Sequence, residues 1–273
     1  MQRRMDASCP TAGADSSAND PPGDSSHYGP VRPTVDLHCH LLPGLDDGAC
    51  NLADSVAMAR QAQEDGIAAI CATPHIRHDH DVRIPELLAR RAEVAAAIAR
   101  AGCATQVLGG GEVATTALDG LDDDELRAVS LGGTARWILL EPAPGPLDDQ
   151  LDSAVKRLSK RGFRPLIAHP ERHLAPDLVQ RLQRLVSHGA LVQATAAFLV
   201  SEATREGMVA LAQEGVIHVL GSDAHSPRTG RPVTLASGLL ALGGVELLAP
   251  HLDWIARVAP QAIVSGQDLT PPF

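Results

Sequence analysis

Short apolar runs alternate with longer amphipathic stretches along the chain from about residue 34 onward. The apolar runs have the length of buried strands, and several of the amphipathic stretches end at a glycine, as helices often do. The pattern predicts strands at residues 34–40, 67–72, 104–108, 135–140, 165–169, 190–195 and 216–221. It predicts helices at residues 51–66, 85–102, 122–130, 147–161, 176–188 and 202–214, with two more after residue 231.

Alternation of strands and helices is typical of parallel strands that are joined by crossover helices. Seven such units predict an α/β fold, a (β/α)7 TIM-like barrel with one unit fewer than the usual eight. A chain of 273 residues is long enough to form such a barrel as one domain. We therefore expect a single domain over residues 34–273.

The first 33 residues have a different composition, rich in Ser, Asp, Gly and Pro and poor in apolar side chains. Such a segment buries too little apolar surface to offset the entropy lost on ordering. We expect residues 1–33 to form a disordered N-terminal tail.

Charge and cysteine content narrow the class of protein. The formal net charge of −10 argues against a nucleic-acid partner, whose phosphates attract an excess of Lys and Arg. The 5 cysteines have no paired spacing, which favours a reducing compartment over a disulfide framework. Arg3 and Arg4 are followed by polar residues rather than an apolar segment, and no run approaches the length of a membrane span. We expect a cytoplasmic protein without membrane insertion.

Polar side chains gather at the end of the first predicted strand. Side-chain alternation along a strand places Asp36, His38 and His40 on one face and Leu37 and Cys39 on the other. A Pro-Gly turn then leads to two further carboxylates in the same stretch. Imidazoles and carboxylates together suit a divalent metal, although a His-x-His pair alone fits a solvated strand end equally well.

Metal-type side chains also end or follow most of the other predicted strands. In a barrel the carboxyl ends of the strands meet on one rim, where catalytic residues gather. A single histidine at a strand end is more often a hydrogen-bonded turn residue, but independent strands rarely deliver so many ligands to one rim by accident. The candidate metal ligands are His38, His40, Asp47, His75, Glu112, Glu141, His169, Asp223 and His225.

This set exceeds the three or so protein ligands of one catalytic zinc ion, so we expect two or three ions. Imidazoles mixed with carboxylates, without a well-placed thiolate, suit Mn²⁺, Zn²⁺ or Fe better than Mg²⁺ alone. Such a cluster can generate hydroxide at neutral pH and neutralise phosphate oxygens, which predicts hydrolysis of a phosphoester.

Two arginines favour a phosphate substrate. Arg172 and Arg231 follow the fifth and seventh predicted strands, and a guanidinium presents a planar fork to two phosphate oxygens. The alternative is a surface arginine that is solvated or, for Arg172, paired with Glu171.

Two further motifs suggest other chemistry. Cys71 and Arg77 have the C-x5-R spacing of phosphatases that attack phosphate with a thiolate, but Pro74 lacks an N–H and Cys71 lies in an apolar strand. We therefore expect a buried cysteine. The glycines at residues 109–111 are not followed by the Lys-Ser/Thr of a nucleotide P-loop, and we expect a permissive turn that presents Glu112.

Five motifs in this order resemble a known family: D-L-H-C-H-x-L-P-G-x-D-D-G, A-T-P-H, G-G-E-V, I-A-H-P-E-R and S-D-A-H. They are similar to the PHP-domain (polymerase and histidinol phosphatase type) hydrolases, and most similar to the metal-dependent bacterial tyrosine phosphatases found with capsule and exopolysaccharide genes. The match spans residues 35–232, nearly all of the predicted domain.

The resemblance implies a distorted seven-stranded barrel of the PHP fold, a Mn²⁺-preferring metal cluster and dephosphorylation of tyrosine on a polysaccharide-export kinase. By matched position it implies the nine candidates above as metal ligands, with Arg172 and Arg231 on the phosphate. Together with Asp223 and His225 these arginines are the candidate catalytic residues. Glu141 departs from the family pattern, because Pro142 follows it where an aromatic residue is usual, so we expect a different pocket there.

Two alternatives remain open at this point. Phe, Trp and Tyr make up only 2% of the chain, so a pocket for a phenol ring would depend on aliphatic walls. The same metal centre could therefore act on a small-molecule phosphate such as histidinol phosphate or a nucleotide. A third hypothesis is a non-catalytic domain that carries metal and binds a kinase.

Overall fold

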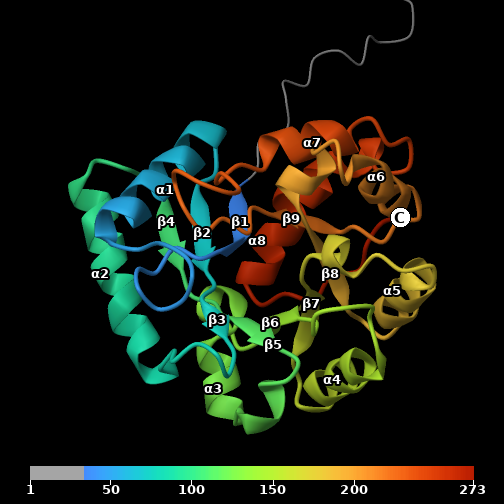
Figure 1. Cartoon of the computed structure of the whole chain (residues 1–273), viewed down its shortest axis with the longest axis horizontal. Helices are drawn as coiled ribbons and strands as arrows, with labels where there is room; N and C mark the ends of the chain where they lie inside the picture. The colour runs from blue at the N-terminus through green and yellow to red at the C-terminus, as the bar shows by residue number, and fades with distance from the viewer. Residues whose placement is uncertain (1–33) are drawn as a thin grey trace, which may run out of the picture. The chain divides into compact units, whose positions relative to one another are not determined.

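The computed structural model describes residues 34–273, so the predicted disordered tail at residues 1–33 lies outside the described residues (Figure 1). Parallel strands and helices alternate along the described chain, which confirms an α/β fold with a parallel sheet. The strands are β1 Val35–Cys39, β2 Ala69–Ala72, β3 His75–Ile76, β4 Gln106–Leu108, β5 Glu112–Ala114, β6 Trp137–Glu141, β7 Arg164–Ile167, β8 Leu191–Thr195 and β9 Val219–Gly221.

The strands form two sheets, ordered β1-β2-β4 and β3-β5-β6-β7-β8-β9. Residues 73–74 separate β2 from β3, and residues 109–111 separate β4 from β5, so each of these two predicted strands continues into the second sheet after a break. β1 also contacts the segment after β9, where His40 N donates to Ala224 O at 2.9 Å and Asp223 N donates to His38 O at 2.8 Å. The parallel sheet is therefore strongly curled.

The described part of the chain has eight α-helices. They are α1 Leu52–Asp65, α2 Leu87–Arg100, α3 Asp123–Ala128, α4 Asp149–Lys160, α5 Leu178–Ser187, α6 Arg205–Gln213, α7 Ala236–Leu242 and α8 Ala259–Val264. Most of them lie around the outside of the strands, whereas α8 lies in the middle of the view (Figure 1). α1 has the predicted ends, because the Asn51 side chain accepts from Asp54 N and Gly66 adopts a left-handed φ of 89°. The segment before α2 differs from the prediction: Pro85 lies in a short 3₁₀ helix, and α2 begins two residues later.

Two apolar clusters stabilise this fold. The larger one lies between strands and helices and includes Cys39, Ile70 and Ile138. The other combines alternate strand residues such as Leu37 and Trp137 with Ile263 of α8, so it fills the space within the curled sheet. No helix among the described residues has the length and apolar character needed to cross a membrane.

The predicted side-chain alternation brings His38 and His40 together, as expected, but is wrong for Asp36, Leu37 and Cys39. Leu37 belongs to the inner cluster and Cys39 to the outer one, and the pairing of β1 with β2 is irregular between Asp36 and Cys39. Asp36 does not join the imidazoles, because its Oδ1 accepts from the backbone N of His38 and of Ser222 at 3.1 and 3.0 Å. A local irregularity of this kind redirects the residues that follow it.

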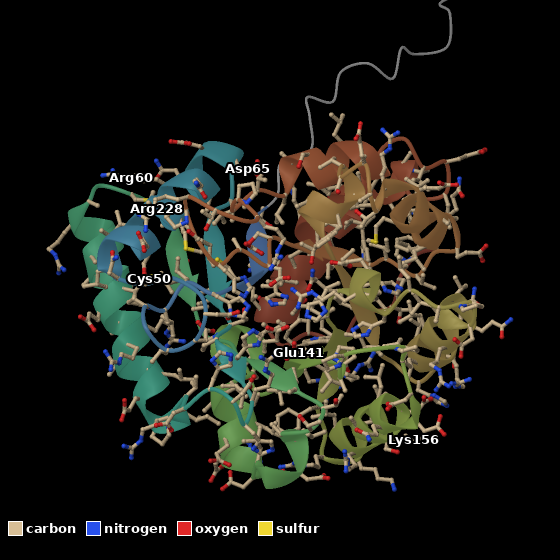
Figure 2. The ribbon with its side chains drawn as sticks, viewed as in Figure 1. Cys50, Arg60, Asp65, Glu141, Lys156 and Arg228 are labelled. Atoms are coloured by element: carbon tan, nitrogen blue, oxygen red, sulfur yellow. The ribbon has the colours of Figure 1, made fainter. Side chains whose placement is uncertain are left out.

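The carboxyl ends of the strands bring polar side chains to the middle of the molecule. Figure 2 shows Glu141, the last residue of β6, pointing to the centre, whereas the exposed Lys156 of α4 lies at the outside. The site described below is built at these strand ends.

Candidate metal centre and phosphate pocket

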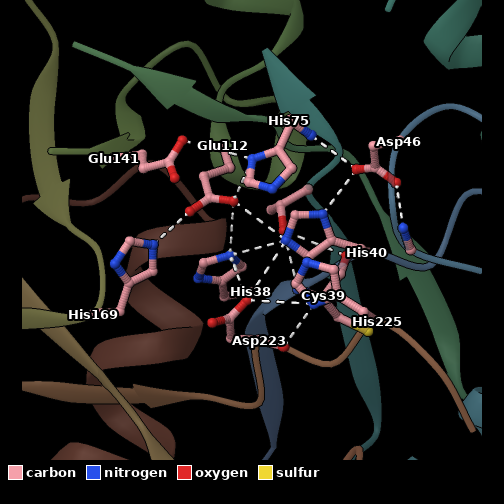
Figure 3. Close-up of polar contacts among 12 residues, drawn as sticks. His38, Cys39, His40, Asp46, His75, Glu112, Glu141, His169, Asp223 and His225 are labelled. Carbon is pink, nitrogen blue, oxygen red and sulfur yellow. Dashed lines mark hydrogen bonds and ion pairs between the residues drawn. The ribbon is translucent and has the colours of Figure 1, made fainter. Parts of the chain in front are cut away.

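His38 of β1 and His40, which follows β1, face the same point because hydrogen bonds fix both rings. Nδ1 of His38 lies 2.9 Å from Gln193 Oε1, and Nδ1 of His40 lies 2.8 Å from Asp46 Oδ2 (Figure 3). Because a carboxylate oxygen can only accept, His40 carries its proton on Nδ1, and the Gln193 oxygen favours the same tautomer for His38. The two Nε2 atoms, 3.3 Å apart, are thus free to act as ligands.

Glu112, the first residue of β5, occupies the centre of the site and is fully buried. Its Oε2 lies 3.2 Å from Nε2 of both His38 and His40 and 3.0 Å from His75 Nδ1. Its Oε1 lies 2.7 Å from His169 Nε2. Burial favours the neutral acid, but His38 and the hydrogen bond from His169 outweigh it and hold the pKa of Glu112 well below its usual value.

A second group of ligand-type atoms extends towards solvent. His75 Nε2 and His225 Nε2 lie 3.5 and 3.4 Å from Asp47 Oδ1, and the rings of His225 and His40 stack with centroids 3.9 Å apart. His75 Nδ1 lies 3.6 Å from Glu141 Oε2. Burial, together with Glu112, raises the pKa of Glu141, so a cation there would favour the charged form.

Asp223 closes the site from the segment after β9. Its Oδ1 lies 3.5 and 3.6 Å from Nε2 of His38 and His40. Its Oδ2 accepts from Nη2 of Arg172 at 2.7 Å and forms an ion pair with Nη2 of Arg231 at 3.0 Å. Burial opposes ionisation, but His38 and its neighbours lower the pKa of Asp223. The backbone is in the left-handed region at Asp223 (φ 49°) and at His169 (φ 34°), as is common where function constrains a residue.

These residues fit a divalent metal. Three sets of ligand atoms lie close enough together to share an ion: His38, His40 and Glu112; His75, Glu112 and Glu141; and His40, Asp47, His75 and His225. Glu112 Oε2, His75 Nδ1 and His169 Nδ1 are buried within the described structure without a hydrogen-bond partner. Buried polar atoms are seldom left unpaired, and imidazole and carboxylate donors suit Mn²⁺, Zn²⁺ or Fe.

A pocket of about 610 Å³ lies beside this centre. Asp47, His75 and His225 border it on the metal side, and Arg172 and Arg231 line it as well. The alternative pairing of Arg172 with Glu171 is wrong, because Arg172 binds Asp223 while Glu171 is buried and accepts from Thr195 N at 3.1 Å. Both arginines predicted to bind phosphate therefore face the same pocket.

Four residues of the site are not among the candidates predicted from the sequence. Asp46 orients His40, Gln193 orients His38, and Arg77 and Arg228 line the pocket. The sequence could have indicated Gln193, because it is a polar residue inside the apolar stretch of β8. Asp46 is one of the two carboxylates noted after the Pro-Gly turn, but adjacent aspartates cannot be assigned to separate partners without the turn geometry.

Neither of the other motifs forms an active site. Cys71 is fully buried, and burial raises the pKa of its thiol to about 12, so no thiolate forms at neutral pH. The glycines before Glu112 serve close packing rather than a positive φ: a Cβ on Gly111 would lie 2.9 Å from Val129 Cβ, and one on Gly110 would lie 2.9 Å from Thr73 Cγ2.

A curled parallel sheet that gathers imidazoles and carboxylates beside an arginine-lined pocket is characteristic of metal-dependent phosphoester hydrolases. Residues 34–239 match the family model described as "Capsular polysaccharide synthesis, CpsB/CapC". The chain belongs to this family, which confirms the resemblance seen in the motifs.

Named relatives agree with this assignment. The chain is 33% identical over 205 residues to the tyrosine-protein phosphatase YwqE of Bacillus subtilis, covering 71% of this chain and 78% of the relative. It is 29% identical over 212 residues to the putative tyrosine-protein phosphatase CapC of Staphylococcus aureus, covering 74% and 80%.

A solved structure is similar over most of the molecule. It comes from a study of YwqE from Bacillus subtilis and CpsB from Streptococcus pneumoniae, described as unique metal-dependent tyrosine phosphatases. The TM-score is 0.74 at 26% identity, and the match covers 87% of this chain and 96% of the other. The fold is therefore shared with these proteins.

Proposed function

We propose that this protein is a metal-dependent protein-tyrosine phosphatase. The observation that carries the proposal is the position of Glu112, which contacts four imidazoles next to the pocket lined by Arg172 and Arg231. The names of the relatives support phosphotyrosine as the substrate. They favour this activity over hydrolysis of a small-molecule phosphate and over a non-catalytic binding role.

The nine candidate ligands would hold two or three ions, and Mn²⁺ is the metal that the family resemblance implies. Glu112 belongs to two of the three sets of ligand atoms and would be shared between ions. His169 and Asp223 would complete the coordination from their own strand ends. When bound, such ions activate water and neutralise phosphoryl oxygens.

The two arginines would bind the non-bridging phosphate oxygens. Their Nη2 atoms converge on one oxygen of Asp223, so both guanidinium groups are already directed to the same point. Arg231 is held further by a bond of 2.8 Å from Nε to Asp223 O. In this proposal Asp223 orients the arginines, and a planar guanidinium then offers paired N–H donors to the phosphate.

The tyrosine leaving group needs little protonation by the protein. A phenol has a pKa of about 10, so tyrosine departs with little help from an acid. His225 is the histidine nearest to solvent in the cluster, and burial and His40 lower its pKa to about 4. It would therefore be neutral at pH 7 and act as a ligand rather than as a proton donor.

The proposal also includes the closure of the barrel, the phosphorylated partner and the cellular location. The contact of β1 with the segment after β9 supports a distorted seven-stranded barrel that is closed, as in the PHP fold. Membership of a capsule-synthesis family supports a tyrosine-phosphorylated polysaccharide-export kinase as the partner, in the cytoplasm.

The test is phosphate release from phosphotyrosine peptides and aryl phosphates, with Mn²⁺ or with a chelator. We expect Mn²⁺ to stimulate release, His169→Ala to abolish it and Cys71→Ser to leave it unchanged. Equal loss in Cys71→Ser without a metal requirement would contradict the proposal. Faster release from histidinol phosphate or nucleotides would support a small-molecule enzyme, and tight kinase binding without release would support a binding role.

A further inference from the structure

Four arginines line the pocket beside the candidate metal centre: Arg77, Arg172, Arg228 and Arg231. Two of them, Arg172 and Arg231, bind Asp223 and are assigned to the phosphate in the proposed function. The chain as a whole has a net charge of −10, so this concentration of positive charge is local to the pocket.

Arg77 has little capacity for another anion. Its Nε and Nη2 donate to the two oxygens of Asp79, both at 2.8 Å, and its Nη1 donates to Glu141 Oε1 at 3.1 Å. Two carboxylates therefore occupy this guanidinium, and 28% of the side chain is exposed.

Arg228 has more unused N–H donors than Arg77, and its side chain is more exposed. Its Nη1 and Nη2 bind the two oxygens of Asp54 at 2.7 and 3.1 Å, which occupies one edge of the guanidinium. A guanidinium has five N–H donors, so the rest remain available to a ligand. The Arg228 side chain is 67% exposed, whereas its partner Asp54 is buried. Asp54 thus holds the guanidinium in place while leaving it open to the pocket.

We propose that Arg228 forms a subsite for the carboxylate of an acidic residue next to the phosphotyrosine of the substrate. This inference rests on the proposed phosphatase function and adds a substrate preference to it. Arg228 lies three residues before Arg231 in one loop, and both line the same pocket of about 610 Å³. Figure 2 shows Arg228 on the α1 side of the molecule. Arg172 is also exposed, but less so at 38%, and its free donors are assigned to the phosphate in the proposed function. Arg228 is thus the pocket arginine with the greatest exposure and with donors left for a second anion.

A purely structural role for Arg228 is the rival explanation. The loop that carries it is docked on one face of α1, where Gln61 Nε2 donates to Pro227 O at 2.9 Å and Asp65 Oδ2 accepts from Leu235 N at 2.7 Å. The ion pair of Arg228 with Asp54 adds to this docking. The two roles differ in which charges they need: a subsite needs the charge of Arg228 and only an acceptor to hold it, whereas a docking ion pair needs the charges of both Arg228 and Asp54.

The experiment compares two peptides that carry a non-hydrolysable phosphotyrosine analogue, one with acidic and one with uncharged neighbours. Binding to the Mn²⁺-loaded full-length protein is measured by fluorescence anisotropy at low and high salt. We expect the acidic peptide to bind about fivefold more tightly, as an exposed ion pair allows, and the difference to shrink as salt rises. Arg228→Gln is expected to abolish the difference.

Two variants serve as controls. Arg60→Gln removes the same charge from an exposed position on α1 that does not line this pocket, and it is expected to keep the preference. Asp54→Asn removes the opposing charge but keeps an amide oxygen that can accept from the guanidinium, so the preference is expected to persist. A loss of preference in Asp54→Asn equal to that in Arg228→Gln would show a docking contact and overturn the proposal.

Equal affinity for the two peptides in the unmodified protein, or no binding of either, would also overturn it. Hydrolysis of the matching phosphotyrosine peptides is measured separately. If neither is hydrolysed while the binding preference is present and depends on Arg228, the phosphatase function fails and the subsite stands.

Discussion

Different acceptors orient His38, in β1, and His40, directly after it. Asp46, a carboxylate, accepts from His40, and Gln193, a neutral amide, accepts from His38. An anionic partner makes an imidazole a stronger electron donor to a metal than a neutral partner does. Asp46 also accepts from His75 N at 2.9 Å and from Gly48 N at 3.0 Å, so its place in the turn is fixed.

Asp46→Asn is therefore expected to weaken Mn²⁺ binding by about 10- to 100-fold. The measurement is a titration of metal-free protein against a competing chelator. Asp268→Asn is the matched control, because Asp268 is exposed and pairs with Arg136 away from the site. Unchanged Mn²⁺ affinity in Asp46→Asn would show that His40 does not need this carboxylate.

His218, outside the candidate metal centre, has a strongly shifted pKa. It lies just before β9, is buried, and its Nδ1 accepts from Val192 N at 3.0 Å. Burial lowers its pKa from 6.5 to about 4, so the folded protein keeps this imidazole neutral while the unfolded chain takes up a proton below pH 6.5. Because the unfolded state binds more protons in that window, stability falls as the pH falls from 6.5 towards 4.

His218→Gln keeps an acceptor for Val192 N but removes the titration. We expect the loss of unfolding free energy between about pH 6.5 and pH 4 to be smaller in the variant by up to about 3 kcal/mol. Urea unfolding across this range, with a chelator present, measures the difference. Parallel curves for the two proteins would mean that His218 does not contribute to the acid sensitivity.

At the scale of the secondary-structure elements, breaks in two predicted strands place two of the candidate ligands side by side. Residues 73–74 and 109–111 separate β2 from β3 and β4 from β5, and the second halves start with His75 and Glu112, which are paired in register. The hydrophobic pattern predicted the first halves but not the breaks. It could not do so because the glycines are required by Thr73, Ile76 and Val129, which are far from them in the sequence.

Gly111→Ala tests this account of the break. Its Cβ would lie 2.9 Å from Val129 Cβ and 3.0 Å from Ile76 Cγ1, so neighbouring atoms must shift. We expect a loss of about 1–3 kcal/mol in the free energy of unfolding, measured by urea denaturation. Gly120→Ala is the control, because a Cβ there meets nothing within 4 Å, and it should change stability by less than about 0.5 kcal/mol. Equal effects of the two changes would contradict the packing argument.

At the scale of the whole molecule, the sequence predicted the parallel α/β architecture and the strand ends at which the candidate ligands gather. It could do so because strand–helix alternation fixes the strand direction, and parallel strands place their carboxyl ends on one side. It could not predict the irregularity in β1, the hydrogen bond of Gln193 to His38 or the pairing of Arg228 with Asp54. These depend on contacts between elements far apart in the chain.

The central claim is that residues from separate strands surround shared metal ions at Glu112. A crystal structure of the Mn²⁺-loaded protein, with anomalous scattering to locate manganese, tests it most directly. We predict two or three manganese ions bound by the nine candidate ligands, with Glu112 shared between two of them. Manganese bound elsewhere, or an empty centre in protein that still releases phosphate from phosphotyrosine, would contradict the claim.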